Sequence, residues 1–253
     1  MNWPGEAVWQ GVEPLLPGFT VEVLPEVDST NTELMRRARA GRAEPVLLVA
    51  ERQTAGRGRL GRGWTSAPGD SLTFSLGLTL GPADWSGLSL AVGVAIAETL
   101  HPRIGLKWPN DLWVDGRKLA GILIETASPG ADAQAPRYTV IGVGINVRPP
   151  TGAGYGTPPA ALDELLPQAS PGAVLARIAR PLVEAVQAFE TFGYTPFRAR
   201  FDARDVLRDR SVVLSDGTSG TAHGTTEAGG LLVHTAVGMT AVTSAEVSVR
   251  PAA

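Results

Sequence analysis

The chain has 253 residues, of which 43% are hydrophobic, and a formal net charge of −3. It is therefore long enough to bury a full core, and its acidity argues against a nucleic acid partner. It contains no cysteine and only three histidines, which excludes a disulfide framework, a zinc cluster, a cysteine nucleophile and most catalytic triads.

No apolar run reaches the roughly 18 residues of a membrane span, and the first residues lack the basic start of a signal peptide. We therefore expect a cytoplasmic protein without a membrane partner. Its chemistry must come from Lys, Arg, Asp and Asn side chains.

The first expected elements are a strand at residues 19–24, a helix and a strand at 46–51. Thr30-x-x-Glu33 has the form of a capping box, which predicts a helix that begins at Thr30 and ends at Gly41.

Residues 53–64 form a glycine-rich loop that carries Arg57, Arg59 and Arg62. Glycine lets the backbone approach a ligand closely, and the arginine fork suits phosphate or carboxylate. The loop also contains G-x-G-x-x-G, but the dinucleotide fingerprint requires a helix that begins there, and breakers follow instead. A disordered Arg-Gly segment that binds RNA would come in repeats and in a basic chain. The loop therefore predicts an anion site, with phosphate as the first candidate.

Residues 72–80 alternate apolar with small side chains, which predicts a strand with one apolar face and one face that leaves room for a ligand. Residues 88–100 are apolar all round and predict a buried helix. Strands are expected at 105–108, 112–114, 119–126 and 138–146, and Asp115-Gly116 predicts a hairpin turn between the second and third of these.

Residues 148–171 predict a long irregular connection with one short helical piece at 160–166, followed by a helix from 174 to 189 with a kink at Pro181. After about residue 207 the composition changes to short β-type runs at 211–214, 230–235 and 246–249. These runs predict a small barrel, and hence two domains, 1–207 and 208–253.

Polar residues gather at the ends of the middle strands. Lys107, Asn110 and Asp111 follow one strand, although an ordinary Pro-Asn-Asp turn is the alternative. Lys118 lies at the head of an apolar strand, where it could simply extend into solvent. Gly142 lies inside another strand that ends at Asn146, and such a glycine predicts close approach by a ligand or by a packed helix.

Taken together, residues 28–31, 53–64, 107–111, 117–125 and 142–146 resemble the biotin protein ligases in order and spacing, from about residue 19 onward. The resemblance implies an α/β (α+β) catalytic domain related to class II aminoacyl-tRNA synthetases, with a mixed sheet, followed by an SH3-like barrel. It also implies a member without the amino-terminal winged helix-turn-helix of repressor-type relatives.

The implied activity is ATP-dependent biotinylation of a lysine on a carrier domain, such as the biotin carboxyl carrier protein, through biotinyl-5′-AMP. Biotin, ATP and Mg²⁺ would be required, no nucleic acid would bind, and a homodimer is left open.

The resemblance also implies roles for individual residues. Lys118, Arg59 and Asp111 would be catalytic, with Asp111 either a Mg²⁺ ligand or the acceptor of a proton from the attacking lysine. The biotin-binding set would be Ser29, Thr30, Gln53, Gly56, Arg57, Lys118, Gly121 and Gly142. The ATP-binding set would be Arg59, Arg62, Trp64, Lys107, Asn110, Asn146 and Arg250, with Glu246 and Arg250 also readable as an ordinary solvated strand end.

One residue departs from the resemblance. Thr73 stands where an aromatic side chain is expected beside the biotin ring, which leaves the packing of that pocket undetermined. Three other functions are weighed: a lipoate ligase with the same acyl-adenylate chemistry, a biotin sensor without turnover, and an RNA-binding module. The arginine-rich loop argues against the lipoate ligase.

Overall fold

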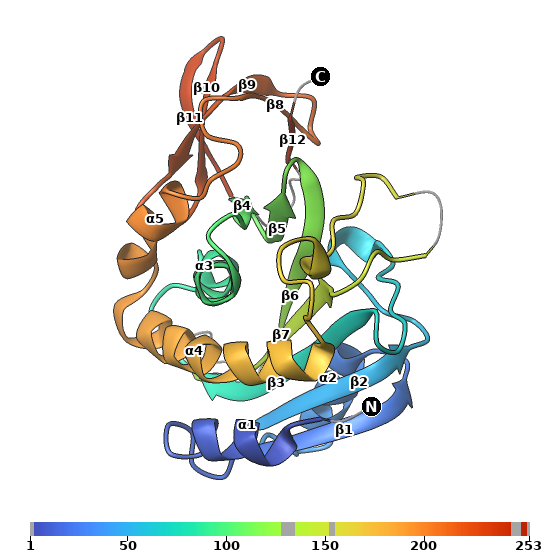
Figure 1. Ribbon diagram of the computed structural model, residues 1–253. Helices are drawn as coiled ribbons and strands as arrows, with labels where there is room; N and C mark the ends of the chain where they lie inside the picture. The colour runs from blue at the N-terminus through green and yellow to red at the C-terminus, as the bar shows by residue number, and fades with distance from the viewer. Residues whose placement is uncertain (1–2, 128–134, 152–154, 244–248, 252–253) are drawn as a thin grey trace.

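The computed structural model describes residues 3–127, 135–151, 155–243 and 249–251. A seven-stranded mixed sheet forms the larger part, and a five-stranded antiparallel sheet forms the C-terminal part. In Figure 1 the C-terminal sheet lies at the end of the large sheet that carries β4 and β5, far from β1. The predicted α/β class with a mixed sheet and a C-terminal β unit is confirmed.

The large sheet has the strand order β1-β2-β3-β7-β6-β5-β4. Only β1 and β2 pair in parallel, and every other neighbouring pair is antiparallel. The strands are β1 (Thr20–Val27), β2 (Val46–Gln53), β3 (Ser71–Leu80), β4 (Gly105–Lys107), β5 (Asp111–Val114), β6 (Arg117–Ala127) and β7 (Arg137–Asn146).

The predicted hairpin turn between β5 and β6 is confirmed. Asp115 and Gly116 have φ values of 48° and 77°, and positive φ at both central residues is what a two-residue type I′ turn requires. This turn fixes the register in which Asp111 and Lys118 face the same side of the hairpin.

Five α-helices accompany the sheets: α1 (Gly5–Val12), α2 (Thr30–Arg39), α3 (Leu88–Leu100), α4 (Pro171–Phe192) and α5 (Thr195–Asp202). Helices α1, α3 and α4 pack together on one face of the large sheet, and α2 packs on the other face. The bounds of α3 agree with the prediction, whereas α1 and α5 were not predicted. Helix α4 continues through Pro181, so the expected kink does not interrupt it.

The predicted capping box of α2 is wrong by one residue. Ser29 is the N-cap, and its hydroxyl accepts a hydrogen bond from Thr32 N. Glu33 turns outward to pair with Arg36 and Arg37 instead of reaching back to the helix start. The Thr30 hydroxyl is therefore not used as a cap and takes part in the buried network described below.

The C-terminal sheet has the order β11-β10-β9-β8-β12. Its strands are β8 (Ser211–Leu214), β9 (Ser219–Thr225), β10 (Leu231–Thr235), β11 (Gly238–Val242) and β12 (Val249–Pro251). Strands β9 and β11 were not predicted because their residues are mostly Gly, Ser, Thr and Ala. The predicted run at 246–249 lies mostly outside the described residues, and the domain boundary at residue 207 remains a prediction.

A buried seam joins the two sheets. Trp108, fully buried, donates a hydrogen bond from Nε1 to Gly229 O at 3.0 Å, and the Tyr194 hydroxyl lies 3.1 Å from Thr225 Oγ1. Buried residues of both sheets also belong to one continuous apolar core. The C-terminal sheet is thus anchored directly behind the Lys107–Asp111 segment.

Asp205 lies on this seam, and its carboxyl group is partly buried. Its Oδ1 accepts a hydrogen bond from Leu207 N at 2.9 Å, while Oδ2 is buried with no hydrogen-bond partner among the described residues. Burial raises the pKa of Asp205 to about 6, the Leu207 N–H opposes this shift, and nearby Asp202 adds to it. Because the folded-state pKa lies above the unfolded value, the ionised carboxylate costs stability above pH 6.

Asp205→Asn should therefore raise the free energy of unfolding at pH 8 by about 1–3 kcal/mol. The gain should disappear as the pH falls from 6 to 4, since wild-type Asp205 is then protonated. Urea unfolding across this pH range measures the difference. Asp216→Asn is the contrast, because hydrogen bonds with Thr218 lower the pKa of Asp216. Loss of this carboxylate should lower the free energy of unfolding at high pH. A gain for Asp205→Asn that is independent of pH would contradict this account.

Candidate active site

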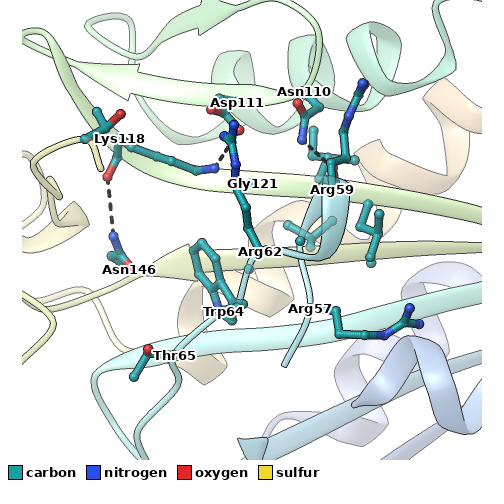
Figure 2. A pocket seen from close by; sticks show the side chains of 18 of the residues that line it. Arg57, Arg59, Arg62, Trp64, Thr65, Asn110, Asp111, Lys118, Gly121 and Asn146 are labelled. Atoms are coloured by element: carbon teal, nitrogen blue, oxygen red, sulfur yellow. Dashed lines mark hydrogen bonds and ion pairs between the residues drawn. The ribbon is translucent and has the colours of Figure 1, made fainter. Parts of the chain in front are cut away.

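A cavity of about 590 Å³ opens on the face of the large sheet that also carries α2. Its walls come from the glycine-rich loop, the ends of β4 to β7, residues 155–159 and Val249 of β12. Figure 2 shows the loop residues Arg62 and Trp64 on one side, with Asp111, Lys118 and Asn146 facing them. Elements far apart in the sequence therefore meet around one space.

The floor of the cavity is a single cross-strand row of mostly small residues. Thr73, Gly144, Gly121 and Asp111 line the cavity and are successive direct partners from β3 to β5. Direct partners in an antiparallel sheet present their side chains on the same face. Because little side-chain volume stands on this row, a trough crosses the strands and ends at a carboxylate.

Trp64 lies on the middle of this floor. A Cβ added at Gly144 would lie 2.4 Å from Trp64 Cε2 and 2.5 Å from Cζ2. The indole is therefore in contact with the bare backbone of Gly144. Gly56 allows a second close approach, since its Cβ would lie 2.4 Å from Trp64 O.

An ion pair stands at one end of the floor. Lys118 Nζ lies 2.7 Å from Asp111 Oδ1, and both side chains are partly buried. A Cβ at Gly121 would lie 3.2 Å from Lys118 Nζ, so the glycine leaves the room in which the ammonium lies. Figure 2 shows the Lys118 side chain extending along the cavity toward Asp111.

A buried polar network stands at the other end. The Gln53 Oε1 atom accepts hydrogen bonds from Thr30 N at 2.8 Å and Thr30 Oγ1 at 3.1 Å. Ser75 Oγ lies 2.7 Å from Thr30 Oγ1 and 2.6 Å from Asn31 Oδ1. Ser29, Thr30, Asn31 and Gln53 line the cavity and can offer fixed donors and acceptors to a polar ring, while the buried Ser75 supports them from behind.

The three arginines of the loop have different surroundings. Arg57 pairs through Nη2 with both carboxylate oxygens of Glu125 at 3.1 Å and points away from the ion pair (Figure 2). Burial lowers the pKa of Arg59, the charge of Asp111 opposes that shift, and the charge of Arg62 reinforces it. Two guanidinium groups thus face the cavity close to one another, which favours a bound anion.

Two amides are tied to the backbone around the cavity. Asn110 Nδ2 donates to Ile122 O at 2.8 Å, and Asn146 Nδ2 donates to Ala160 O at 3.0 Å. Lys107 is almost fully buried, and its Nζ lies 5.3 Å from the centroid of the Trp113 ring. All three residues line the cavity.

Asp111 is the one carboxylate among the described residues that line the cavity. The described part of the chain holds no group of three or more His, Cys, Asp or Glu side chains that could cage a metal. Mg²⁺ characteristically binds one or two carboxylates together with substrate phosphates. The residues therefore fit a Mg²⁺ ion that is bound by substrate phosphates together with Asp111. They do not fit a metal site built from protein ligands alone.

The structure brings most of the predicted site residues to this one cavity. The side chain of Arg250 and all of Glu246 lie outside what the structure describes. The space beside Gly142 is filled by a residue of helix α2, because a Cβ at Gly142 would lie 2.1 Å from Asn31 Oδ1. The packed-helix alternative therefore holds at this glycine. Thr73 is buried and donates to Ala50 O at 2.9 Å.

Sequence reasoning missed some residues that line the cavity, namely Asn31, Tyr155, Pro158 and Pro159. Asn31 follows Ser29 and Thr30 directly, so its neighbours were a usable signal. The other three lie in an irregular connection with no periodicity, and no local signal distinguishes them.

Comparison with known proteins gives a consistent picture. Residues 23–146 match the Biotin/lipoate A/B protein ligase family. The bifunctional ligase/repressor BirA of Escherichia coli is 36% identical over 233 residues, which cover 86% of this chain and 70% of the relative. The biotin–acetyl-CoA-carboxylase ligase of Mycobacterium tuberculosis is 41% identical over 138 residues, which cover 50% of this chain and 49% of the relative.

Solved structures agree with these relatives. The biotin protein ligase from Aquifex aeolicus in complex with biotin and ATP superposes with a TM-score of 0.77 at 29% identity, over 92% of this chain and 99% of that one. Among the described residues, no helix combines the length and apolarity that crossing a membrane needs.

The contact between Gly144 and Trp64 predicts a specific energetic coupling. Gly144→Ala should lower the free energy of unfolding by about 1–3 kcal/mol, because the new methyl group collides with the indole. In a Trp64→Ala background the same substitution should cost much less, since the collision partner is gone. Urea unfolding of the four proteins measures the cycle. Gly11→Ala, where a Cβ meets nothing within 4 Å, is the control. Equal costs in both backgrounds would contradict the contact.

Proposed function

The chain belongs to the biotin/lipoate A/B protein ligase family, and from that premise we propose that it is a biotin protein ligase. It joins biotin to ATP to give biotinyl-5′-AMP and pyrophosphate, and then transfers the biotinyl group to a lysine of a carrier domain such as the biotin carboxyl carrier protein of acetyl-CoA carboxylase. The observation that carries the proposal is that Lys118 shares one cavity with a polar network that can hold a ring and with the cationic side chains of Arg59 and Arg62.

In the first step a biotin carboxylate oxygen attacks the α-phosphorus of ATP. The new O–P bond forms as the bond to the β-phosphate oxygen breaks, and pyrophosphate leaves with that electron pair. The reactants are two anions, so the protein must mainly hold them together and stabilise the charge that develops. Lys118 has an ammonium that can donate to both the carboxylate and the α-phosphate. Arg59 and Arg62 supply the remaining positive charge.

The biotin ring would lie at the end formed by Ser29, Thr30 and Gln53. The ring of biotin carries a urea, which has one carbonyl acceptor and two N–H donors, and the buried network presents matching hydroxyl and amide groups. Gly56, Gly121 and Gly142 and the backbone of Arg57 complete the biotin-binding set.

The nucleotide would lie beyond Trp64, whose flat indole can stack on adenine. Lys107, Asn110, Asn146 and Arg250 form the rest of the proposed nucleotide set. Because Asn110 and Asn146 are held by backbone carbonyls, their remaining amide atoms have fixed directions.

In the second step the ε-amine of the carrier lysine attacks the biotinyl carbonyl carbon, and AMP leaves with the electron pair of the C–O bond. The amine must lose a proton, and Asp111 is the carboxylate in place to accept it. When bound, Mg²⁺ supplies charge neutralisation on the phosphates, and Asp111 is the residue that would hold it.

The setting of the reaction is part of the proposal. The cytoplasm, which supplies ATP, is the proposed location of the reaction. Biotin, ATP and the carrier protein are the proposed partners, and neither a nucleic acid, a membrane nor a homodimer is needed for either step.

Transfer of labelled biotin to a biotin carrier domain, with ATP and Mg²⁺, tests the function. Lys118→Ala should reduce the rate by about 10²–10³-fold, because a preorganised donor to the developing charge is lost. Lys118→Arg keeps the charge but changes the geometry and should remain impaired. Lipoate in excess should not compete. Transfer of lipoate in place of biotin would move the chain to the sister activity, and tight biotin binding without any transfer would indicate a sensor.

Arg59 is proposed to seal the intermediate in the cavity, because it is half-buried in the glycine-rich loop near Asp111. Arg59→Gly should release biotinyl-AMP about 10–100-fold faster, the equivalent of one charge-assisted hydrogen bond. Labelling of lysines on a bystander protein measures the leak. Retention of the intermediate equal to that of the wild type would disprove the sealing role.

A further inference from the structure

The backbone of Lys118 is not paired with the backbone of strand β7. The pairing of β6 with β7 begins at Ala120, opposite Ile145, so the first residues of β6 have no partner from β7. A segment of the irregular connection takes that place. Lys118 N donates to Pro158 O at 2.9 Å, and Ala160 N donates to Lys118 O at 2.8 Å.

This segment takes the place of β7 beside β6 and pairs with it in parallel, with Lys118 opposite Pro159. Asn146, the last residue of β7, joins the two by donating from Nδ2 to Ala160 O at 3.0 Å and to Lys118 O at 3.4 Å. The Asn146 contact with Lys118 is drawn in Figure 2. Residues 158–161 thus support the strand from which the Lys118 side chain extends.

A bidentate ion pair holds this segment in place. Arg117 Nη1 lies 3.0 Å from Glu164 Oε1, and Nη2 lies 2.5 Å from Oε2. Glu164 Oε1 also accepts a hydrogen bond from Ala161 N at 2.9 Å, and Arg117 Nη1 reaches Pro159 O at 3.4 Å. The pair therefore connects the residue before Lys118 to Pro159 and Ala161 of the supporting segment.

The strength of this pair comes from its geometry. Its side chains are about one-third exposed, and an isolated pair at that exposure adds little to global stability. The two hydrogen bonds between Arg117 and Glu164, together with the one that Glu164 accepts from Ala161 N, fix the direction of the pair as well as its distance. Hydrogen bonds to Arg117 lower the pKa of Glu164, and hydrogen bonds to Glu164 raise the pKa of Arg117.

We propose that Arg117 and Glu164 are positioning residues for the ligase reaction. Their ion pair holds residues 158–161 against the backbone of Lys118 and thereby sets where Lys118 Nζ meets Asp111 and the two reacting anions. The inference rests on the proposed function, because it assigns the pair a role in adenylate formation. Neither residue was singled out by sequence reasoning, and Glu164 is 47 residues away from Arg117.

The test compares Arg117→Gln, Glu164→Gln and the charge swap Arg117→Glu with Glu164→Arg. Glu164→Gln is the sharpest single change, because a glutamine oxygen can still accept from Ala161 N while the charge is lost. Arg200→Gln is the matched control, since Arg200 forms a bidentate pair with Glu98 at 3.2 and 2.6 Å and similar exposure, away from the cavity.

Steady-state pyrophosphate release with biotin, ATP and a biotin carrier domain gives kcat and KM, biotin titration gives Kd, and thermal unfolding gives Tm. Misplacement of Lys118 should lower kcat by about 10–100-fold in the single variants, with a much smaller change in the Kd for biotin and no change in the Tm. The charge swap should restore most of kcat, and Arg200→Gln should behave as wild type.

A kcat for Glu164→Gln equal to that of wild type would overturn the inference. So would a loss of kcat that follows Tm and appears equally in Arg200→Gln, because the pair would then act only through stability. Absence of pyrophosphate release from the wild type would instead refute the proposed function, so the two failures are distinguishable.

Discussion

The absence of side-chain volume along one cross-strand row is the constraint on which this structure depends. Thr73, Gly144 and Gly121 leave a trough across three neighbouring strands, and the indole of Trp64 can lie flat only because Gly144 has no Cβ. The row lines one cavity that also contains Lys118, so two ligands bound in this cavity would be neighbours of the same ammonium group. Helices α1, α3 and α4 pack on the opposite face, so the cavity shares its own face with helix α2.

The charges follow from the same arrangement. The described lining holds one carboxylate, Asp111, against five Lys and Arg side chains, although the whole chain is acidic. Such local excess of positive charge stabilises bound phosphates and carboxylates together. The Lys118–Asp111 pair keeps the ammonium oriented along the trough. Buried amides and hydroxyls occupy the other end, where a neutral polar ring fits better than an anion.

Sequence reasoning succeeded where the signal was local. Helix α3, the Asp115-Gly116 turn and the alternation of β3 were predicted because periodicity and turn chemistry act over a few residues. The motifs also identified the main cationic residues, which the structure places in one cavity. The rest depended on contacts distant in sequence: Asn31 fills the space at Gly142, and Glu164 pairs with Arg117. No pattern within one segment contains these partners, and α1 and α5 had too few periodic positions to be distinguished.

Direct detection of the acyl-adenylate is the most direct test of the central claim that one trough joins biotin to the nucleotide. The protein is incubated with biotin, ATP and Mg²⁺ without any carrier, and the bound small molecules are identified by mass spectrometry. The account predicts protein-bound biotinyl-5′-AMP in a single turnover, with pyrophosphate released in equal amount. Intact ATP, or release of ADP and inorganic phosphate without a biotinyl nucleotide, would contradict it.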